Sequence, residues 1–218
     1  MNLRRILPLI LGVLWIGLAG FGIIGLISYS MQAGAKGNAS GKWPQESQIQ
    51  RSSSPTLLVF LHPECACSEA TVAELGKLLA HGSERVETIA VFIQPKSWSE
   101  ARLKGKLWSQ ASRIPHLRTV IDATGTEAEL FGAKTSGHAT LYGTGGQLLF
   151  EGGITGSRGH QGDNAGVSSI AKLLAGEKPD VKGTDVFGCG LFDSPMFSAV
   201  GRTLAGLLPM AHQKHGQR

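Results

Sequence analysis

The 218-residue sequence has few aromatic residues, little cysteine and no concentrated run of basic charge. Aromatic side chains make up 6% of the chain, and the lysines and arginines behind its net charge of +5 are scattered. Proteins that bind nucleic acid gather basic and aromatic side chains on one face, so these scarcities argue against a nucleic-acid partner. The 42% apolar content is enough for one ordinary globular domain with accessory segments.

Charged residues are absent from residues 6–29, ILPLILGVLWIGLAGFGIIGLISY. About 20 apolar residues can cross a bilayer. Arg4 and Arg5 precede the span and favour a cytoplasmic N-terminus by the positive-inside rule. A cleavable signal peptide is the alternative, but its apolar core is only about 7 to 15 residues long. We therefore expect an uncleaved single-pass anchor in the inner (cytoplasmic) membrane, with the soluble part in the periplasm.

Composition divides the chain into four parts. Residues 1–30 form a cytoplasmic stub and the transmembrane anchor, and residues 31–55, rich in Gly, Ser, Gln, Lys and Asn, predict a flexible tether. Residues 56–180 form the folded domain. Residues 181–218 combine a cysteine-containing loop with an amphipathic helix that either docks on the domain or lies on the membrane surface.

Within the domain, short apolar runs alternate with segments of helical periodicity. The first strand, helix and second strand predict a parallel β-α-β unit, and two glycines in GTGG predict the turn of a late hairpin. We expect strands at 56–62, 86–95 and 117–125, a hairpin at 138–154, and helices at 68–82, 98–112, 126–133 and within 164–180. Gly176 and Pro179 stop the last of these helices.

The chain has three cysteines, and two of them, Cys65 and Cys67, are one residue apart. Disulfides persist outside the cytoplasm, and an odd count leaves at least one thiol over. Both cysteines fall where a buried strand passes into a helix. Backbone N–H groups and the helix dipole stabilise a thiolate at such a helix start, although Glu64 opposes this effect.

Three interpretations of the pair remain open. In the first, Cys65 is an exposed nucleophile and Cys67 resolves the mixed disulfide, through a Cys65–Cys67 ring that would be tight and labile; Cys189 is the alternative resolving thiol. In the second, the thiolates bind Cu(I), while the spacing does not suit structural zinc. In the third, the cysteines are inert apolar residues. Further ligands for the copper alternative are available at His62, His138, Cys189 and Met196.

The motif HPECACSEA, followed by VIDATGTEAELFGAKTSGHATLYGTGGQLLFEGGI, resembles the thioredoxin-like fold in its membrane-anchored, extracytoplasmic branch. Together with GGITGSRGHQGDNAG and a late FGC, it is similar more narrowly to RedB-like proteins. The resemblance covers residues 56–176. It implies a three-layer α/β/α domain with a mixed central sheet, preceded by one transmembrane helix. It also implies thiol-disulfide oxidoreductase activity on an extracytoplasmic protein thiol or disulfide partner, without a cofactor.

Two departures separate this chain from that family. The family has C-x-x-C where this chain has C-x-C, and Ala139 stands where the family has a cis-proline. A cis bond before a non-proline residue costs about 2.5 to 4 kcal/mol, so we expect a trans bond. Loss of the proline leaves His138 free to approach Cys65, which favours the copper-binding alternative. A non-catalytic binding domain that keeps the fold is a third possibility.

The glycine-rich segment 151–166 lacks the G-K-[ST] of a phosphate-binding loop. One interpretation is a turn-rich connection in which Asp163 or Asn164 caps the next helix. The other places Arg158 and His160 near the cysteines, as a thiolate stabiliser and a proton donor. The predicted supporting residues of the thiol site are His62, Pro63, His138, Arg158 and His160.

Overall fold

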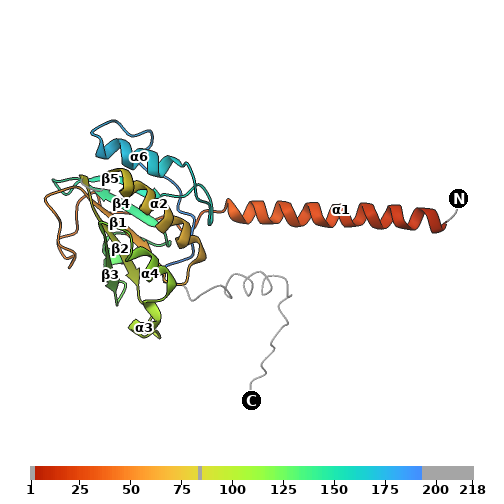
Figure 1. Cartoon of the computed structure of the whole chain (residues 1–218), viewed down its shortest axis with the longest axis horizontal. Coiled ribbons are helices and arrows are strands. Elements are labelled where there is room, and N and C mark those ends of the chain that lie inside the picture. Colours follow the sequence, from red (N-terminus) through yellow and green to blue (C-terminus); the bar gives the residue numbers. More distant parts are fainter. Residues whose placement is uncertain (1–2, 83–84, 193–218) are drawn as a thin grey trace, which may run out of the picture.

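The computed structural model describes residues 3–82 and 85–192 (Figure 1). A long helix, α1 (Leu3–Ser30), extends away from an α/β domain. The domain elements, in chain order, are β1 (Thr56–Leu61), α2 (Ala66–Gly82), β2 (Glu87–Ile93), α3 (Glu100–Leu103), α4 (Lys106–Ala111), β3 (Leu117–Asp122), α5 (Thr126–Leu130), β4 (His138–Tyr142), β5 (Leu148–Gly153) and α6 (Ala165–Leu174). The predicted C-terminal helix and Met196 lie outside the described residues.

The five strands form one mixed sheet in the order β3-β2-β1-β4-β5. Strands β1, β2 and β3 are parallel, whereas β4 runs antiparallel to both β1 and β5. Every residue of the central strand β1 is buried, because both faces of the sheet are covered. A parallel β-α-β unit followed by an antiparallel hairpin confirms the predicted thioredoxin-like fold.

Helices α2, α4 and α6 cover one face of the sheet, where Leu75 of α2, Leu107 of α4 and Ile170 of α6 meet side chains of the strands. The opposite face is covered by α5 and by part of the chain that precedes β1. There Phe60 and Tyr142 pack with Phe131, which follows α5. These two apolar layers on either side of the sheet make the three-layer arrangement.

The expected helix at residues 98–112 is two short helices, α3 and α4. Ser99 caps α3 by accepting a hydrogen bond from the backbone N–H of Arg102. Gly105 then adopts an extended conformation and starts α4. Apolar periodicity runs through both pieces, since Leu103 and Leu107 face the same core, so periodicity alone could not locate the break.

Residues 31–55, expected to be a flexible tether, lie against the domain. Trp43 packs edge-on against Phe131, with ring centroids 5.0 Å apart, and Ile49 retains only 5% exposure. The buried carboxylate of Glu127 accepts hydrogen bonds from Ser47 Oγ (2.6 Å) and from the N–H of Gln48 (2.8 Å). A few apolar and polar anchors thus fix a segment whose average composition is typical of a linker.

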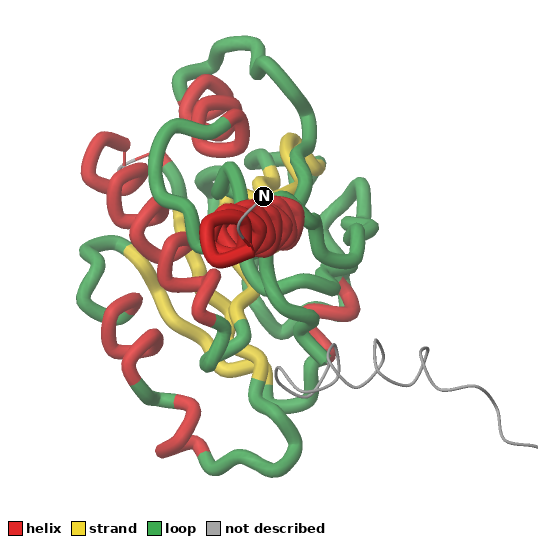
Figure 2. Tube along the Cα trace, turned by 90° about the vertical axis from the view of Figure 1, so that its right-hand side faces the viewer, coloured by secondary structure: helices red, strands yellow, loops and turns green. Residues whose placement is uncertain are grey.

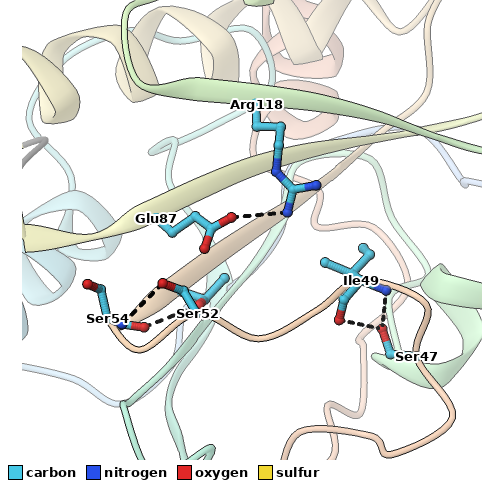
Figure 3. Close-up of polar contacts among 7 residues, drawn as sticks. Ser47, Ile49, Ser52, Ser54, Glu87 and Arg118 are labelled. Carbon is cyan, nitrogen blue, oxygen red and sulfur yellow. Dashed lines mark hydrogen bonds and ion pairs between the residues drawn. The ribbon is translucent and has the colours of Figure 1, made fainter.

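Local side-chain bonds shape the approach to β1 (Figure 3). Ser52 Oγ accepts from the N–H of Ser54, and Ser47 Oγ accepts from the N–H of Ile49. Nearby, Arg118 of β3 donates to Glu87 of β2 at 3.0 Å and ties the sheet edge together. Serine hydroxyls that bond to the backbone two residues away favour such turns.

Predicted caps and turns are found in the structure. Asn164 caps α6 by accepting from the N–H of Val167 at 2.9 Å. Gly176, with φ of 78°, ends that helix in the left-handed conformation, and Gly146, with φ of 77°, turns the β4–β5 hairpin. No cis peptide bond occurs in the described part of the chain, so the bond before Ala139 is trans, as expected.

Within α1, Leu7–Ser30 has a mean hydropathy of 2.4 and is not buried against the domain. This stretch is long and apolar enough to cross a membrane. The last residue of α1 contacts the domain, where the carbonyl of Ser30 accepts a hydrogen bond from the N–H of Arg158. Figure 2 looks along α1 and shows the helix end-on in front of the domain, and Figure 1 shows that it leaves the domain on one side.

Candidate active site

Cys65 occupies the cap position of α2. The strand β1 ends at Leu61, Pro63 supplies no N–H to continue a ladder, and a turn closes through the bond from the Cys65 N–H to the His62 carbonyl (3.1 Å). The carbonyl of Cys65 then accepts from the N–H of Ser68 (2.9 Å). Cys65 was expected to be exposed, but it retains 3% exposure, because other segments cover the start of α2.

One covering segment is the Cys189 strap, defined here as residues 183–191. It lies antiparallel to the residues before β4: the N–H of Ser136 donates to the Cys189 carbonyl (2.8 Å), and the N–H of Leu191 donates to the Lys134 carbonyl (2.9 Å). Gly188 permits this close approach, since a Cβ there would overlap the carbonyl oxygen of Ser136. The strap thus extends the folded domain beyond the expected boundary at residue 180.

Strap pairing brings the sulfurs of Cys65 and Cys189 to 3.2 Å from each other, although the residues are 124 positions apart. That distance is a hydrogen-bonding contact between unbonded thiols. Cys67, in the first turn of α2, is partly buried and also interacts with Cys65. The structure therefore gathers all three cysteines of the chain at one end of α2.

The pKa values of the three thiols shift in different directions. Hydrogen bonding from Cys189, then from Cys67, together with a bond from Ser68, lowers the pKa of Cys65 well below its usual range, against the opposing effect of burial. The same bonds raise the pKa of Cys67 and of Cys189, and burial and the charge on Cys65 add to both increases. These opposite pKa shifts favour the thiolate at Cys65 and the protonated thiol at Cys67 and Cys189.

Arg158 is the cation beside this cluster, and its positive charge partly offsets the raised pKa values of Cys67 and Cys189. Its guanidinium donates to the carbonyl of Gly188 in the strap (2.7 Å) and to the carbonyl of Gln32 just after α1 (3.0 Å). It also lies 5.1 Å from the ring centroid of Tyr29. Arg158 thus links the glycine-rich segment, the strap and the end of α1.

A buried hydroxyl pair fastens the strap side of the site to α2. Ser136 Oγ accepts a hydrogen bond from the N–H of His62 (2.7 Å) and lies 2.6 Å from Ser68 Oγ. Both serines are buried. Neither was predicted as a site residue, because only the fold brings positions 68 and 136 together.

His62 lies beside Cys65 and is buried against Trp98. Its Nδ1 accepts from the N–H of Glu64 (3.3 Å). Burial lowers the pKa of His62, and the charges on Cys65 and Glu64 oppose that shift. At neutral pH the imidazole of His62 is therefore uncharged where it lies beside Cys65.

His138 lies on the opposite face of the sheet from α2. It pairs with Phe60 across β1 and β4, and the two rings pack edge-on in the layer that contains α5. Neither of its ring nitrogens forms a hydrogen bond within the described residues; Nε2 lies 3.6 Å from Glu151 Oε1. Burial lowers its pKa to about 4, with Glu151 opposing the shift. The expected approach of His138 to Cys65 is therefore wrong.

His160 is exposed in the glycine-rich segment, where its N–H bonds to the carbonyl of Ser157 (3.3 Å). Across residues 3–82 and 85–192, no group of three or more His, Cys, Asp or Glu side chains is arranged to hold a metal ion. Of the predicted supporting residues, His62, Pro63 and Arg158 border the thiols, whereas His138 does not.

Comparisons with known proteins address the fold. No protein-family model and no curated protein matches the sequence. Solved structures do match. A hypothetical protein from Sinorhizobium meliloti 1021 is 14% identical, with a TM-score of 0.54 over 76% of this chain and 97% of that one. An uncharacterized conserved protein from Geobacillus kaustophilus is 16% identical, with a TM-score of 0.53 over 76% of this chain and 94% of that one. The exposed lipoprotein thioredoxin of Streptococcus pneumoniae strain TIGR4 matches at 17% identity and a TM-score of 0.43, over 57% of this chain and 85% of that one. The chain thus shares its fold with the Sinorhizobium meliloti and Geobacillus kaustophilus proteins, and it carries a three-thiol cluster at the start of α2.

Proposed function

We propose that this protein is a membrane-anchored, extracytoplasmic thiol-disulfide exchange protein whose redox couple is Cys65 and Cys189. The observation that carries the proposal is the 3.2 Å contact between these sulfurs, made by two segments that are distant in sequence. A thiolate at a helix start, supported by neighbouring donors, is the usual requirement for a reactive cysteine. The sequence analysis favours Cys67 as the thiol that resolves the mixed disulfide, whereas the contact between the two sulfurs favours Cys189.

The exchange transfers two electrons. The dithiol form of the protein and a partner disulfide pass through one mixed disulfide to the Cys65–Cys189 disulfide and a partner dithiol, and the reverse path uses the same intermediate. Cys67 takes no part in the bond. Its thiol stabilises the Cys65 thiolate, and its position one residue into α2 would close a tight ring with Cys65.

The anchor and the site are close to each other. Arg158 bonds to both Gln32 and Gly188, and the N–H of Gly34 donates to the carbonyl of Val186 in the strap (2.8 Å). If α1 spans the membrane, the thiols lie on the membrane-proximal side of the domain. Arg4 and Arg5, which precede the apolar stretch of α1, support an extracytoplasmic domain, and the motifs around the three cysteines support a place among RedB-like proteins.

The first test is disulfide mapping on the full chain in detergent, after equilibration in glutathione buffers that cover a range of redox potentials. The wild type and Cys67→Ser should form one reversible bridge, Cys65–Cys189, and Cys189→Ser should lose it. Persistence of a Cys65–Cys67 bridge in Cys189→Ser, with none to Cys189 in the wild type, would refute the assigned couple.

The same preparations distinguish the alternatives. Reduced thiols that never form a bridge, but hold one Cu(I) tightly and lose it in Cys65→Ser, would establish copper delivery. Thiols that neither bridge nor bind copper would establish a non-catalytic binding domain. Either result would overturn the redox proposal.

A further inference from the structure

We propose that Cys189, and not Cys65, is the sulfur that forms the mixed disulfide with the partner. This inference rests on the proposed exchange function and reverses the roles that the sequence suggests. It follows from which sulfur of the couple a second protein can reach.

The two residues of the couple differ in exposure. Cys65 retains 3% exposure under the strap, whereas Cys189 is exposed on the strap itself. Thiolate attack on a disulfide requires access to the sulfur that is attacked. The attacking sulfur approaches in line with the bond that breaks. Attack on Cys189 therefore comes from the side away from Cys65, and attack on Cys65 would have to come from the side away from Cys189, where Cys65 is enclosed.

The strap fixes this arrangement through its backbone. The bonds Ser136 N–H to Cys189 carbonyl and Leu191 N–H to Lys134 carbonyl hold the chain on both sides of the cysteine. The side chain of Leu191 is buried, with 2% exposure. Because these contacts involve no sulfur atom, we expect them to persist when either cysteine is replaced by serine.

The chemistry balances in both directions. When a partner thiolate attacks Cys189, the Cys65–Cys189 bond breaks, Cys65 leaves as a thiolate, and the partner sulfur is bonded to Cys189. A second partner thiolate then displaces Cys189, which takes up a proton from water; the partner is oxidised and the couple is reduced. In reverse, Cys189 passes its proton to Cys65 as it attacks a partner disulfide. The departing partner thiolate accepts that proton, and Cys65 then closes the bond.

The charges around the couple support these roles. A thiolate that is stabilised leaves faster from a disulfide, and the lowered pKa of Cys65 makes it the better leaving group of the two. Arg158 places positive charge beside Cys189, where the incoming or departing partner thiolate carries negative charge.

The test uses the full chain in detergent, in a Cys67→Ser background, with oxidised glutathione as the probe. Glutathione adducts are quenched with acid, alkylated and mapped by mass spectrometry. We expect the adduct on Cys189, its accumulation when Cys65→Ser is added, and much slower adduct formation when Cys189→Ser leaves Cys65 alone. An adduct found mainly on Cys65, formed equally fast without Cys189, would overturn the inference.

Two further results distinguish a failure of this inference from a failure of the proposed function. If neither cysteine exchanges with glutathione, the proposed function itself fails; if exchange occurs only through Cys65, the function stands and the inference falls. Arg158→Gln should slow adduct formation at Cys189 several-fold. Arg118→Gln, which removes a guanidinium from the Glu87 ion pair, should leave the rate unchanged. Equal rates in both arginine variants would contradict the charge argument.

Discussion

A disulfide between Cys65 and Cys189 would cross-link positions 124 residues apart, whereas one between Cys65 and Cys67 would enclose almost no chain. Loop closure in the unfolded chain predicts a stabilisation of about 5 kcal/mol for the long loop and about 1.5 kcal/mol for the short one. The free energy of unfolding therefore reports which couple forms. The reference protein is Cys65→Ser, which forms neither bridge and has no thiolate at this position.

We expect the oxidised wild type and oxidised Cys67→Ser to exceed Cys65→Ser by about 5 kcal/mol. With a urea dependence of about 2 kcal/mol per molar, the unfolding midpoint would rise by roughly 2.5 M. Oxidised Cys189→Ser should gain nothing, or about 1.5 kcal/mol if it forms the short ring. The measurement is urea unfolding in detergent, followed by tryptophan fluorescence. A gain in the wild type that disappears in Cys67→Ser and remains in Cys189→Ser would refute the reasoning.

The free energy of unfolding of the reduced protein should also depend on pH, and the pKa shift of Cys65 fixes the sign of that dependence. Folding lowers the pKa of Cys65, so its contribution is largest above the unfolded thiol value of about 8.5 and declines as the pH falls. The raised pKa values of Cys67 and Cys189 leave their contributions constant below that pH. Reduced wild type should therefore gain stability over Cys65→Ser as the pH rises from 5 to 8, in the same urea assay.

Three other changes test separate parts of the structure. Gly188→Ala should separate the strap from Ser136 and slow formation of the Cys65–Cys189 bridge in a timed thiol assay, while Gly41→Ala, which meets open space, should not. Glu127→Gln should destabilise the domain by about 1 to 3 kcal/mol and speed proteolysis within residues 47–52, while Glu129→Gln, at an exposed position, should do neither. His138, with its pKa lowered to about 4, binds its proton more weakly in the folded state than in the unfolded state. The free energy of unfolding should therefore fall as the pH drops from about 6.5 toward 4. The variant His138→Leu should lack that part of the loss in acid unfolding. Unchanged bridge formation, proteolysis or acid sensitivity would contradict the respective contact.

Local patterns in the sequence were sufficient for the main elements of the domain. The apolar run at β1 and the helical spacing of α2 predicted both elements, and hence a cysteine at the start of a helix. Asn164 and Gly176 marked the ends of α6 because capping and left-handed turns depend on the residue itself. The parallel unit and late hairpin followed from the order of these elements, and the thioredoxin-like fold followed from the resemblance of the motifs around Cys65.

The predictions that failed depended on a segment's neighbours. The composition of residues 31–55 is that of a linker, and the buried carboxylate of Glu127 that holds it belongs to α5. His138 follows a glycine in a strand, and the register of β4 against β1 turned its ring away from α2. Neither the partner nor the face can be read from the residues alone.

The sequence by itself determined the main elements of the domain, the apolar span of α1 and the placement of Cys65 at a helix start, because each depends on residues close together in the chain. Only the tertiary structure decided that Cys189 meets Cys65, that Cys65 is buried and that Arg158 links the strap to the residues just after α1. These contacts depend on strand pairing and packing between segments that are distant in sequence, and local propensity carries no information about which distant segment will be the neighbour.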